Sequence, residues 1–237
     1  MQDDWFNRLD DSLWLKSDGS GRDDAVFIKR ALRLERGDRV LDAPCGAGRV
    51  ALHLAEAGCL VTGIDSNPGF VERAKRAFAD SRLPGDFRIL DLRDVEFHET
   101  FDAVCNCDGS FGYCTDDENL AILRRMAAAI KPGGRLLVEQ VNRERILRHF
   151  LSESLAGNAV RRNRWDAGSQ RLESALYTDA GERPGSFLSV RLYTPSQFKQ
   201  LLVKAGLIFE MAYGGVDGAS YTTASRRFIA VGRKSPI

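Results

Sequence analysis

The sequence lacks any apolar run near the ~20 residues that a membrane-spanning helix needs. It also lacks an excess of one charge, because 34 Lys and Arg residues stand against 33 Asp and Glu residues, for a formal net charge of +1. This balance provides no general attraction for nucleic acids or for anionic lipid surfaces. We therefore expect neither nucleic acid nor membrane among the partners of this protein.

Histidine and cysteine are also few, with three and five residues respectively. The cysteines are odd in number and fall in or beside predicted core strands, which favours reduced thiols. Cys105 and Cys107 share one face of a strand, but no second Cys or His pair has the spacing of a metal site, so we predict no metal. The first five residues are acidic and lack a signal-peptide pattern, and we expect a cytoplasmic location.

The length of 237 residues suits one α/β domain with an added lid. Apolar runs alternate with segments of helical periodicity through most of the chain. In the first helical segment, Trp5 and Trp14 fit core packing better than a flap over a ligand. Strands are expected at residues 40–42, 59–65, 86–90, 101–108, 135–141, 207–213 and 227–233, the last two as an antiparallel pair. Helices are expected at 3–36 with a break at 17–21, and at 49–57, 68–81, 117–130, 143–155 and 195–205.

The segment 142–193 departs from this alternation. After the helix at 143–155, residues 164–166, 170–177 and 186–193 read as short antiparallel strands, with turns at 167–168 and 180–181. We predict a small antiparallel β cap inserted after the fifth strand. Residues 1–141 and 194–237 would then form the core, and 142–193 a lid over the substrate that is also a candidate homodimer surface.

The stretch 40–51 is a strand, a tight loop and the start of a helix. Gly46 and Gly48 permit backbone angles closed to other residues and let a ligand approach the main chain. The helix that follows directs its free N–H groups toward the same space. Residues 46–51 also fit the dinucleotide fingerprint G-x-G-x-x-[GA]. However, Asp42 would repel a pyrophosphate and would suit a cationic amino acid, and Asp65 after the second strand suits a ribose diol.

Four motifs in order carry a family resemblance: residues 42–49, 63–66, 90–93 and 131–136. Together they resemble the class I S-adenosylmethionine-dependent methyltransferases. This resemblance implies S-adenosyl-L-methionine as cofactor and a Rossmann-like, seven-stranded, mostly parallel sheet with helices on both faces. Residues 110–113 and 117–120 are similar to those of a bacterial small-molecule branch of the family.

The resemblance also implies roles for individual residues. Asp42, Gly46 and Gly48 would hold the amino acid end of the cofactor, and Asp65 the ribose. Asp91 and Leu92 would contact the adenine. The further residues expected at the cofactor are Ala43, Cys45, Arg49, Ser66 and Cys107.

Methyl transfer from a sulfonium needs alignment and exclusion of water more than covalent help. A general base is required only when the acceptor atom is protonated. His149 is the candidate base because its ordinary pKa suits the task, although a histidine on a helix surface is the competing interpretation. Expected acceptor contacts are Tyr113, Trp165, Arg191 and Tyr193. Arg191 and Tyr193 share a strand face and could bind a carboxylate or phenolate, or simply lie exposed on the cap.

The expected function is transfer of a methyl group from S-adenosylmethionine to an oxygen or nitrogen of a small-molecule acceptor. An RNA or protein methyltransferase and a non-catalytic nucleoside-binding module remain alternatives. Reduction with NAD(P) is disfavoured by Asp42 and by the lack of a Tyr-x-x-x-Lys motif. The basic run 161–164 is a candidate nucleic-acid contact, but the near-zero net charge favours a solvated loop.

Overall fold

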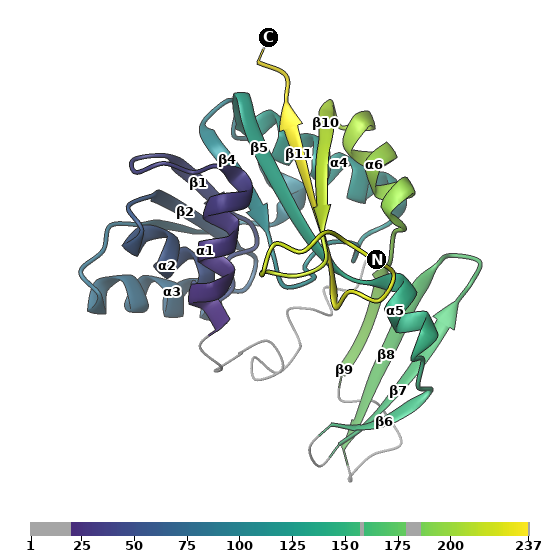
Figure 1. Ribbon diagram of the computed structural model, residues 1–237. Helices are drawn as coiled ribbons and strands as arrows, with labels where there is room; N and C mark the ends of the chain where they lie inside the picture. Colours follow the sequence, from purple (N-terminus) through teal and green to yellow (C-terminus); the bar gives the residue numbers. More distant parts are fainter. Residues whose placement is uncertain (1–19, 157–158, 179–185, 237) are drawn as a thin grey trace.

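The computed structural model describes residues 20–156, 159–178 and 186–236 (Figure 1). Trp5, Trp14 and the expected turn at 180–181 lie outside these ranges. No helix within the described ranges is both long and apolar enough to cross a membrane.

The main body is a seven-stranded sheet in the order β10-β11-β5-β4-β1-β2-β3. Strands β1 to β5 run parallel, while β11 is antiparallel to both β5 and β10. Central strands such as β1 are buried on both faces, which is why they read as continuous apolar runs. The strands are β1 (Arg39–Asp42), β2 (Leu60–Asp65), β3 (Asp86–Ile89), β4 (Phe101–Asn106), β5 (Ile130–Val141), β10 (Leu207–Tyr213) and β11 (Arg227–Lys234).

Helices cover both faces of this sheet, as Figure 1 shows. One buried cluster joins the sheet to three helices through Phe27, Leu54 and Val71. The other joins it to two helices through Leu123 and Phe198. These helices are α1 (Ser20–Leu32), α2 (Arg49–Glu56) and α3 (Pro68–Asp80) on one face, and α4 (Asp116–Ala129) and α6 (Pro195–Lys204) on the other. The predicted Rossmann-like sheet with helices on both faces is confirmed.

Local capping signals account for where several helices begin. Asn67 caps α3 by accepting hydrogen bonds from Gly69 and Phe70, with Pro68 in the first turn. Thr115 and Glu118 form a reciprocal capping box at α4, and Thr194 forms another at α6. These starts lie within one residue of the predicted ones because the caps are local in sequence.

Two predicted element boundaries differ from those of the structure. Helix α1 begins at Ser20, inside the break expected at 17–21. The end of the helix predicted before residues 131–134 is confirmed, since α4 ends at Ala129, but strand β5 begins at Ile130 and not at the predicted residue 135. The Pro-Gly-Gly sequence there coincides with a shift in register between β4 and β5, so the chain absorbs it as an irregularity in the ladder.

A second, four-stranded antiparallel sheet lies between β5 and α6 in the chain, in the order β6-β7-β8-β9. Its strands are β6 (Glu153–Ala156), β7 (Ala159–Asp166), β8 (Arg171–Thr178) and β9 (Ser186–Arg191), preceded by α5 (Arg143–Arg148). Figure 1 shows this sheet projecting from the main body next to α5. The antiparallel cap after the fifth strand is thus confirmed, while its boundaries as a domain and its role as a dimer surface stay predictions.

The helix predicted over 143–155 is wrong in its second half. Helix α5 ends at Arg148, and residues from Glu153 onward pair with β7. Asn163 secures the intervening chain, since its side chain donates to the Leu151 carbonyl and its backbone N–H to that of Ser152. The strand predicted over 164–166 corresponds to β7. Its predicted start is also wrong, because β7 begins at Ala159. Pairing between strands here overrides the helical spacing of apolar residues.

Candidate functional site

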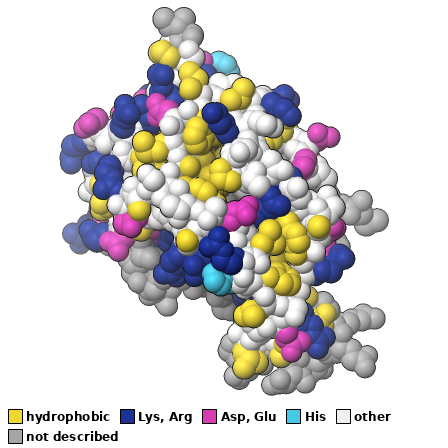
Figure 2. All heavy atoms as spheres, turned by 45° about the vertical axis from the view of Figure 1, so that its right-hand side comes forward, with side chains coloured by type: hydrophobic (Ala, Val, Ile, Leu, Met, Phe, Trp, Pro, Cys, Tyr) yellow, Lys and Arg dark blue, Asp and Glu magenta, His cyan; other side chains and the backbone are white. Residues whose placement is uncertain are grey.

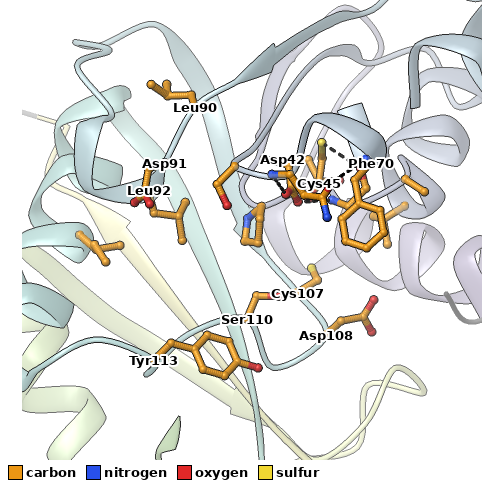
Figure 3. Close-up of a pocket in the computed structure, with 18 of the residues that line it drawn as sticks. Asp42, Cys45, Phe70, Leu90, Asp91, Leu92, Cys107, Asp108, Ser110 and Tyr113 are labelled. Carbon is orange, nitrogen blue, oxygen red and sulfur yellow. Dashed lines mark hydrogen bonds between the residues drawn. The ribbon is translucent and has the colours of Figure 1, made fainter. Parts of the chain in front are cut away.

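A cavity opens at the carboxyl ends of β1, β2, β3 and β4 (Figure 3). Parallel sheets bind ligands at this edge because the loops after neighbouring strands meet there. The loop 44–47 after β1, residues 65–67 at the end of β2, and residues 90–93 after β3 line one part of it. Cys107, Asp108, Ser110, Tyr113 and Cys114, which follow β4, line the other part.

The loop after β1 has the backbone that its glycines allow. Gly46 has φ 52° and Gly48 has φ 80°, both in the left-handed region. A Cβ atom on Gly48 would lie 3.0 Å from the Cβ of Ala74, so this glycine also lets α2 pack against α3. Gly48 and the fully buried Ala43 lie behind the cavity wall, whereas the other nine residues predicted at the cofactor line it.

Asp42 ends β1 with its side chain at the cavity and is only 2% exposed. Its carboxylate lies 3.5 Å from the Cys105 thiol, and no salt bridge reaches it from the described residues. Burial raises the pKa of Asp42 to about 7, with Asp108 adding to the rise, while the Cys105 thiol and Arg49 oppose it. A cationic group entering the cavity would therefore stabilise the ionised form of this carboxylate.

Asp65 and Asp91 lie at the ends of the next two strands. Asp65 accepts hydrogen bonds from the backbone N–H groups of Gly46 and Asn67, both at 2.9 Å. Burial raises the pKa of Asp65, and those two N–H groups act against the rise. Burial alone would also raise the pKa of Asp91, but the guanidinium and N–H of Arg93 lower it overall. The three predicted acids therefore border one cavity, in three different electrostatic environments.

Arg49 lines the cavity but is neutralised by this chain. Its guanidinium contacts Asp24 of α1 and Asp108 after β4, each at 2.6 Å. Arg227 of β11 also contacts Asp24, at 2.8 Å, and Glu139 of β5 at 3.4 Å. No sequence pattern predicts this network, because its members are 25 to 203 residues apart. The one local signal for the network was Asp108, an acid two residues after the end of β4. This residue adopts a φ of 58°.

Cys107 and Tyr113, which follow β4, are neutral near pH 7. Contact with Cys105 lowers the pKa of Cys107, but burial and nearby acids raise it more, to about 11. Burial raises the pKa of Tyr113 well above its ordinary value. In Figure 3 the Tyr113 hydroxyl points into the cavity, on the side where Ser110 and Asp108 lie. The Cys107 thiol and the Tyr113 hydroxyl can orient a ligand by donating hydrogen bonds, but they are poor acceptors of protons at this pH.

Of the four predicted acceptor contacts, only Tyr113 lines the cavity. Arg191 is 7% exposed and donates to Asp116 at 3.1 Å, so its fork holds an internal carboxylate and not that of an acceptor. The hydroxyl of Tyr193 donates to the same Asp116, and the ring lies 4.6 Å from the Arg191 guanidinium. Trp165 lies on β7 beneath the guanidinium of Arg143, at 5.4 Å. These three residues are placed outside the cavity, where they support the cap.

His149, the candidate base, follows the last turn of α5 and is exposed. It follows the exposed Arg148 directly and the exposed Arg145 by one turn. Figure 2 shows basic side chains gathered beside a histidine on the face that it draws. It is not among the residues that line the cavity. The prediction that His149 lies near the pocket depends on a helix over 143–155, and α5 ends at Arg148, before this residue.

Apolar lining residues were also missed by sequence analysis. Phe70 of α3, Leu90 after β3 and Ile122 of α4 border the cavity. In the sequence Phe70 and Ile122 read as ordinary members of a core stripe, and Leu90 belongs to the motif 90–93 but was not itself predicted as a ligand contact. Among the described residues, no three His, Cys, Asp or Glu side chains are grouped as a metal site would require.

Comparison with known proteins agrees with this geometry. Residues 40–134 match the family model described as a methyltransferase domain. The chain is 35% identical over 115 residues to the S-adenosyl-L-methionine-dependent Diels-Alderase iccD of Talaromyces variabilis, over 47% of this chain and 39% of that protein. It is 36% identical over 109 residues to a ubiquinone biosynthesis O-methyltransferase of Xanthomonas campestris, over 45% of this chain and 44% of the relative. The chain thus spans about two fifths of these curated relatives.

Solved structures share the fold over nearly the whole chain. The CcbJ methyltransferase of Streptomyces caelestis has a TM-score of 0.77 at 20% identity, covering 98% of this chain and 100% of that one. The sugar N-methyltransferase KedS8 of Streptoalloteichus has a TM-score of 0.68 at 22% identity, covering 92% and 89%. The fold is that of a Rossmann-like methyltransferase. Residues 40–134 of this chain are similar to a methyltransferase domain, and the described fold is shared with solved methyltransferases.

Proposed function

We propose that this protein transfers a methyl group from S-adenosylmethionine to an oxygen or nitrogen of a small-molecule acceptor. The observation that carries the proposal is the buried Asp42 carboxylate, which has no salt bridge from the described residues and faces a cavity beside the glycine loop. A buried acid without a countercharge is costly unless a ligand supplies one. The α-ammonium of S-adenosylmethionine supplies that charge.

The rest of the cavity fits the same cofactor. Asp65 accepts one N–H on each carboxylate oxygen and keeps lone pairs for the two hydroxyls of a ribose. Asp91 and the backbone of Leu92 would meet the polar edge of the adenine. Phe70 and Leu90 provide apolar surface for its ring. The cofactor supplies a methyl group activated by its positive sulfur, and this chain binds and orients it.

The acceptor would approach from the side of Cys107, Ser110 and Tyr113. Tyr113 and Cys107 keep their protons near pH 7, so they orient the acceptor by hydrogen bonding and do not deprotonate it. Asp108 is engaged by Arg49. This wall therefore favours acceptors that are nucleophilic without an enzymatic base, such as neutral amines or acidic hydroxyls.

The relatives support a small acceptor, since one is named for ubiquinone biosynthesis and another as a sugar N-methyltransferase. A second candidate function rests on the relative named as a Diels-Alderase, which is described as dependent on S-adenosylmethionine. In that case this chain would bind the nucleoside and use it without consuming the methyl group. An RNA or protein acceptor receives no support from the net charge of +1.

Calorimetric titration with S-adenosylmethionine and S-adenosylhomocysteine tests the binding part of the proposal. Wild type should bind both, and Asp42→Asn should bind both more weakly. Asp86→Asn is the matched control, because Asp86 begins β3, pairs with Arg88 and is not among the residues that line the cavity. Failure of wild type to bind either nucleoside would overturn the proposal.

Transfer itself is tested with methyl-labelled cofactor and a panel of phenols, amines and amino sugars. Label in a product together with S-adenosylhomocysteine supports methyl transfer. Binding of the nucleoside while it remains intact with every acceptor would favour the second candidate function.

A further inference from the structure

One side chain of the cap reaches the loop that forms the acceptor side of the cavity. Arg171, the first residue of β8, donates from Nη1 to the carbonyl of Cys114 at 3.0 Å. Its Nη2 contacts the carbonyls of Gly112 at 3.1 Å and Tyr113 at 3.0 Å. A single guanidinium thus holds three consecutive carbonyl groups of the chain.

The cap fixes this guanidinium from its other side. Nε of Arg171 donates to the Ser189 hydroxyl at 2.9 Å, and Nη2 also contacts the Ser189 carbonyl at 3.1 Å. Ser189 belongs to β9, which pairs with β8 along its length. The cap sheet therefore holds Arg171 from the side opposite to the loop.

The loop lies directly against the base of the cap. The carbonyl of Gly112 also accepts the backbone N–H of Arg191 at 2.8 Å. Gly112 has φ 106°, and a Cβ atom there would lie 2.5 Å from the Arg191 carbonyl oxygen. Gln140 of β5 donates to the carbonyls of both Phe111 and Arg191, at 3.1 Å each. The loop, the cap and β5 therefore meet through hydrogen bonds to backbone groups, and the close packing at Gly112 leaves no space for a side chain there.

The two sides of this loop have different partners. Its carbonyl groups at 112–114 face the cap, whereas the side chains of Tyr113 and Cys114 line the cavity. We propose that Arg171 is a positioning residue of the site: by holding these carbonyls it directs Tyr113 into the cavity and couples the cap to ligand binding. The acceptor-facing role of Tyr113 rests on the proposed function.

The chemistry of the residue matters for this role. A guanidinium presents its N–H groups in a rigid planar fork and can serve several carbonyls at once. A lysine at 171 would keep the charge but offer a single ammonium on a flexible stem. Arg171→Lys should therefore retain only part of the effect, whereas Arg171→Met removes every donor while keeping the apolar stem.

The test measures the cavity directly. Protein labelled with 3-fluorotyrosine is observed by ¹⁹F NMR, with the Tyr113 resonance assigned from Tyr113→Phe, and affinity for S-adenosylhomocysteine is measured by calorimetry. Arg171→Met should shift or broaden the Tyr113 resonance. Because Tyr113 and Cys114 border the same cavity as the proposed nucleoside contacts, it should also weaken binding about tenfold, an effect of about 1.4 kcal/mol. Arg171→Lys should lie between Arg171→Met and wild type.

Arg164→Met is the matched control, because Arg164 is an exposed arginine of the same sheet, paired with Glu173. It should leave both readouts unchanged. Should Arg171→Met fail to fold, Ser189→Ala, which removes one acceptor of the guanidinium, should produce a smaller shift of the same resonance.

A lower melting temperature with an unmoved Tyr113 resonance and wild-type affinity would overturn the proposal and leave Arg171 a merely structural residue. Failure of wild type to bind the nucleoside is a separate outcome. It would remove the proposed function, while the Tyr113 resonance would still report whether Arg171 positions the loop.

Discussion

The carboxylate of Asp65 accepts a hydrogen bond from the backbone N–H of Gly46 at 2.9 Å. This contact joins the end of β2 to the glycine loop that follows β1, 19 residues earlier. The second carboxylate oxygen of Asp65 accepts the N–H of Asn67, which caps α3. One acid therefore holds the glycine loop and the start of α3 in place before a ligand arrives, and the cavity is largely preformed.

Replacement of Asp65 by alanine should weaken S-adenosylmethionine binding by about 1–3 kcal/mol. The ribose hydroxyls would lose their acceptor, and the N–H of Gly46 would lose the partner that holds the loop. Calorimetry gives the affinity directly. Asp86→Ala removes a carboxylate outside the cavity and should bind as wild type does; equal affinities for wild type and Asp65→Ala would refute the assigned role.

The affinity for S-adenosylmethionine should rise with pH between about 6 and 8. The pKa of Asp42 is about 7 in the free protein, and the ammonium of the ligand binds the ionised carboxylate. Protonation of Asp42 therefore competes with the ligand below pH 7, and the rise should level off above pH 8. Titrations at several pH values test this, and Asp42→Asn should show a weaker and flatter profile. If the affinity of wild type did not change with pH, Asp42 would not be the group that binds the ammonium of the ligand.

The same acid should make the free protein less stable as pH rises. The pKa of Asp42 is raised from 3.8 to about 7 by burial, so the folded state holds a proton that the unfolded state releases. Its contribution to stability is complete below pH 3.8 and is lost as pH increases through about 7. Asp42→Asn should therefore gain stability relative to wild type between pH 5 and pH 8, measured by urea unfolding. A constant difference between the two proteins would contradict the raised pKa.

Gly112→Ala should destabilise the protein by roughly 2–3 kcal/mol, because the new methyl group meets the Arg191 carbonyl at 2.5 Å with φ at 106°. Gly109 in the same loop is the matched control. Its φ is 72°, and a Cβ there would meet nothing within 4 Å, so Gly109→Ala should cost only about 1–2 kcal/mol of backbone strain. Urea unfolding of both variants provides the comparison. Similar losses at the two positions would show that the Arg191 contact is unimportant.

Much of the cofactor side of the cavity could be predicted from the sequence. Asp42, Asp65 and Asp91 each follow an apolar run, and parallel strands bring their carboxyl ends to one edge of the sheet. The starts of α3, α4 and α6 were also predictable, because each cap lies within a few residues of the helix that it begins.

The acceptor side depended on contacts between distant segments. From the sequence, the Arg191 guanidinium is a candidate to bind an acceptor carboxylate. In the structure it binds the carboxylate of Asp116, 75 residues earlier. Arg171 reads as an ordinary strand residue, yet it holds carbonyls 57 to 59 residues away. The apolar spacing after α5 favours a helix, and pairing with β7 makes part of it a strand.

The sequence by itself determined the order of strands, loops and helices and the acids that meet at the cavity. These depend on local periodicity, local capping and the geometry of a parallel sheet. Only the tertiary structure decided which charges face the ligand and which neutralise one another. Pairings such as Asp24 with Arg49 and Arg171 with the loop 112–114 arise when separate elements pack together, and no pattern within either segment encodes the partner.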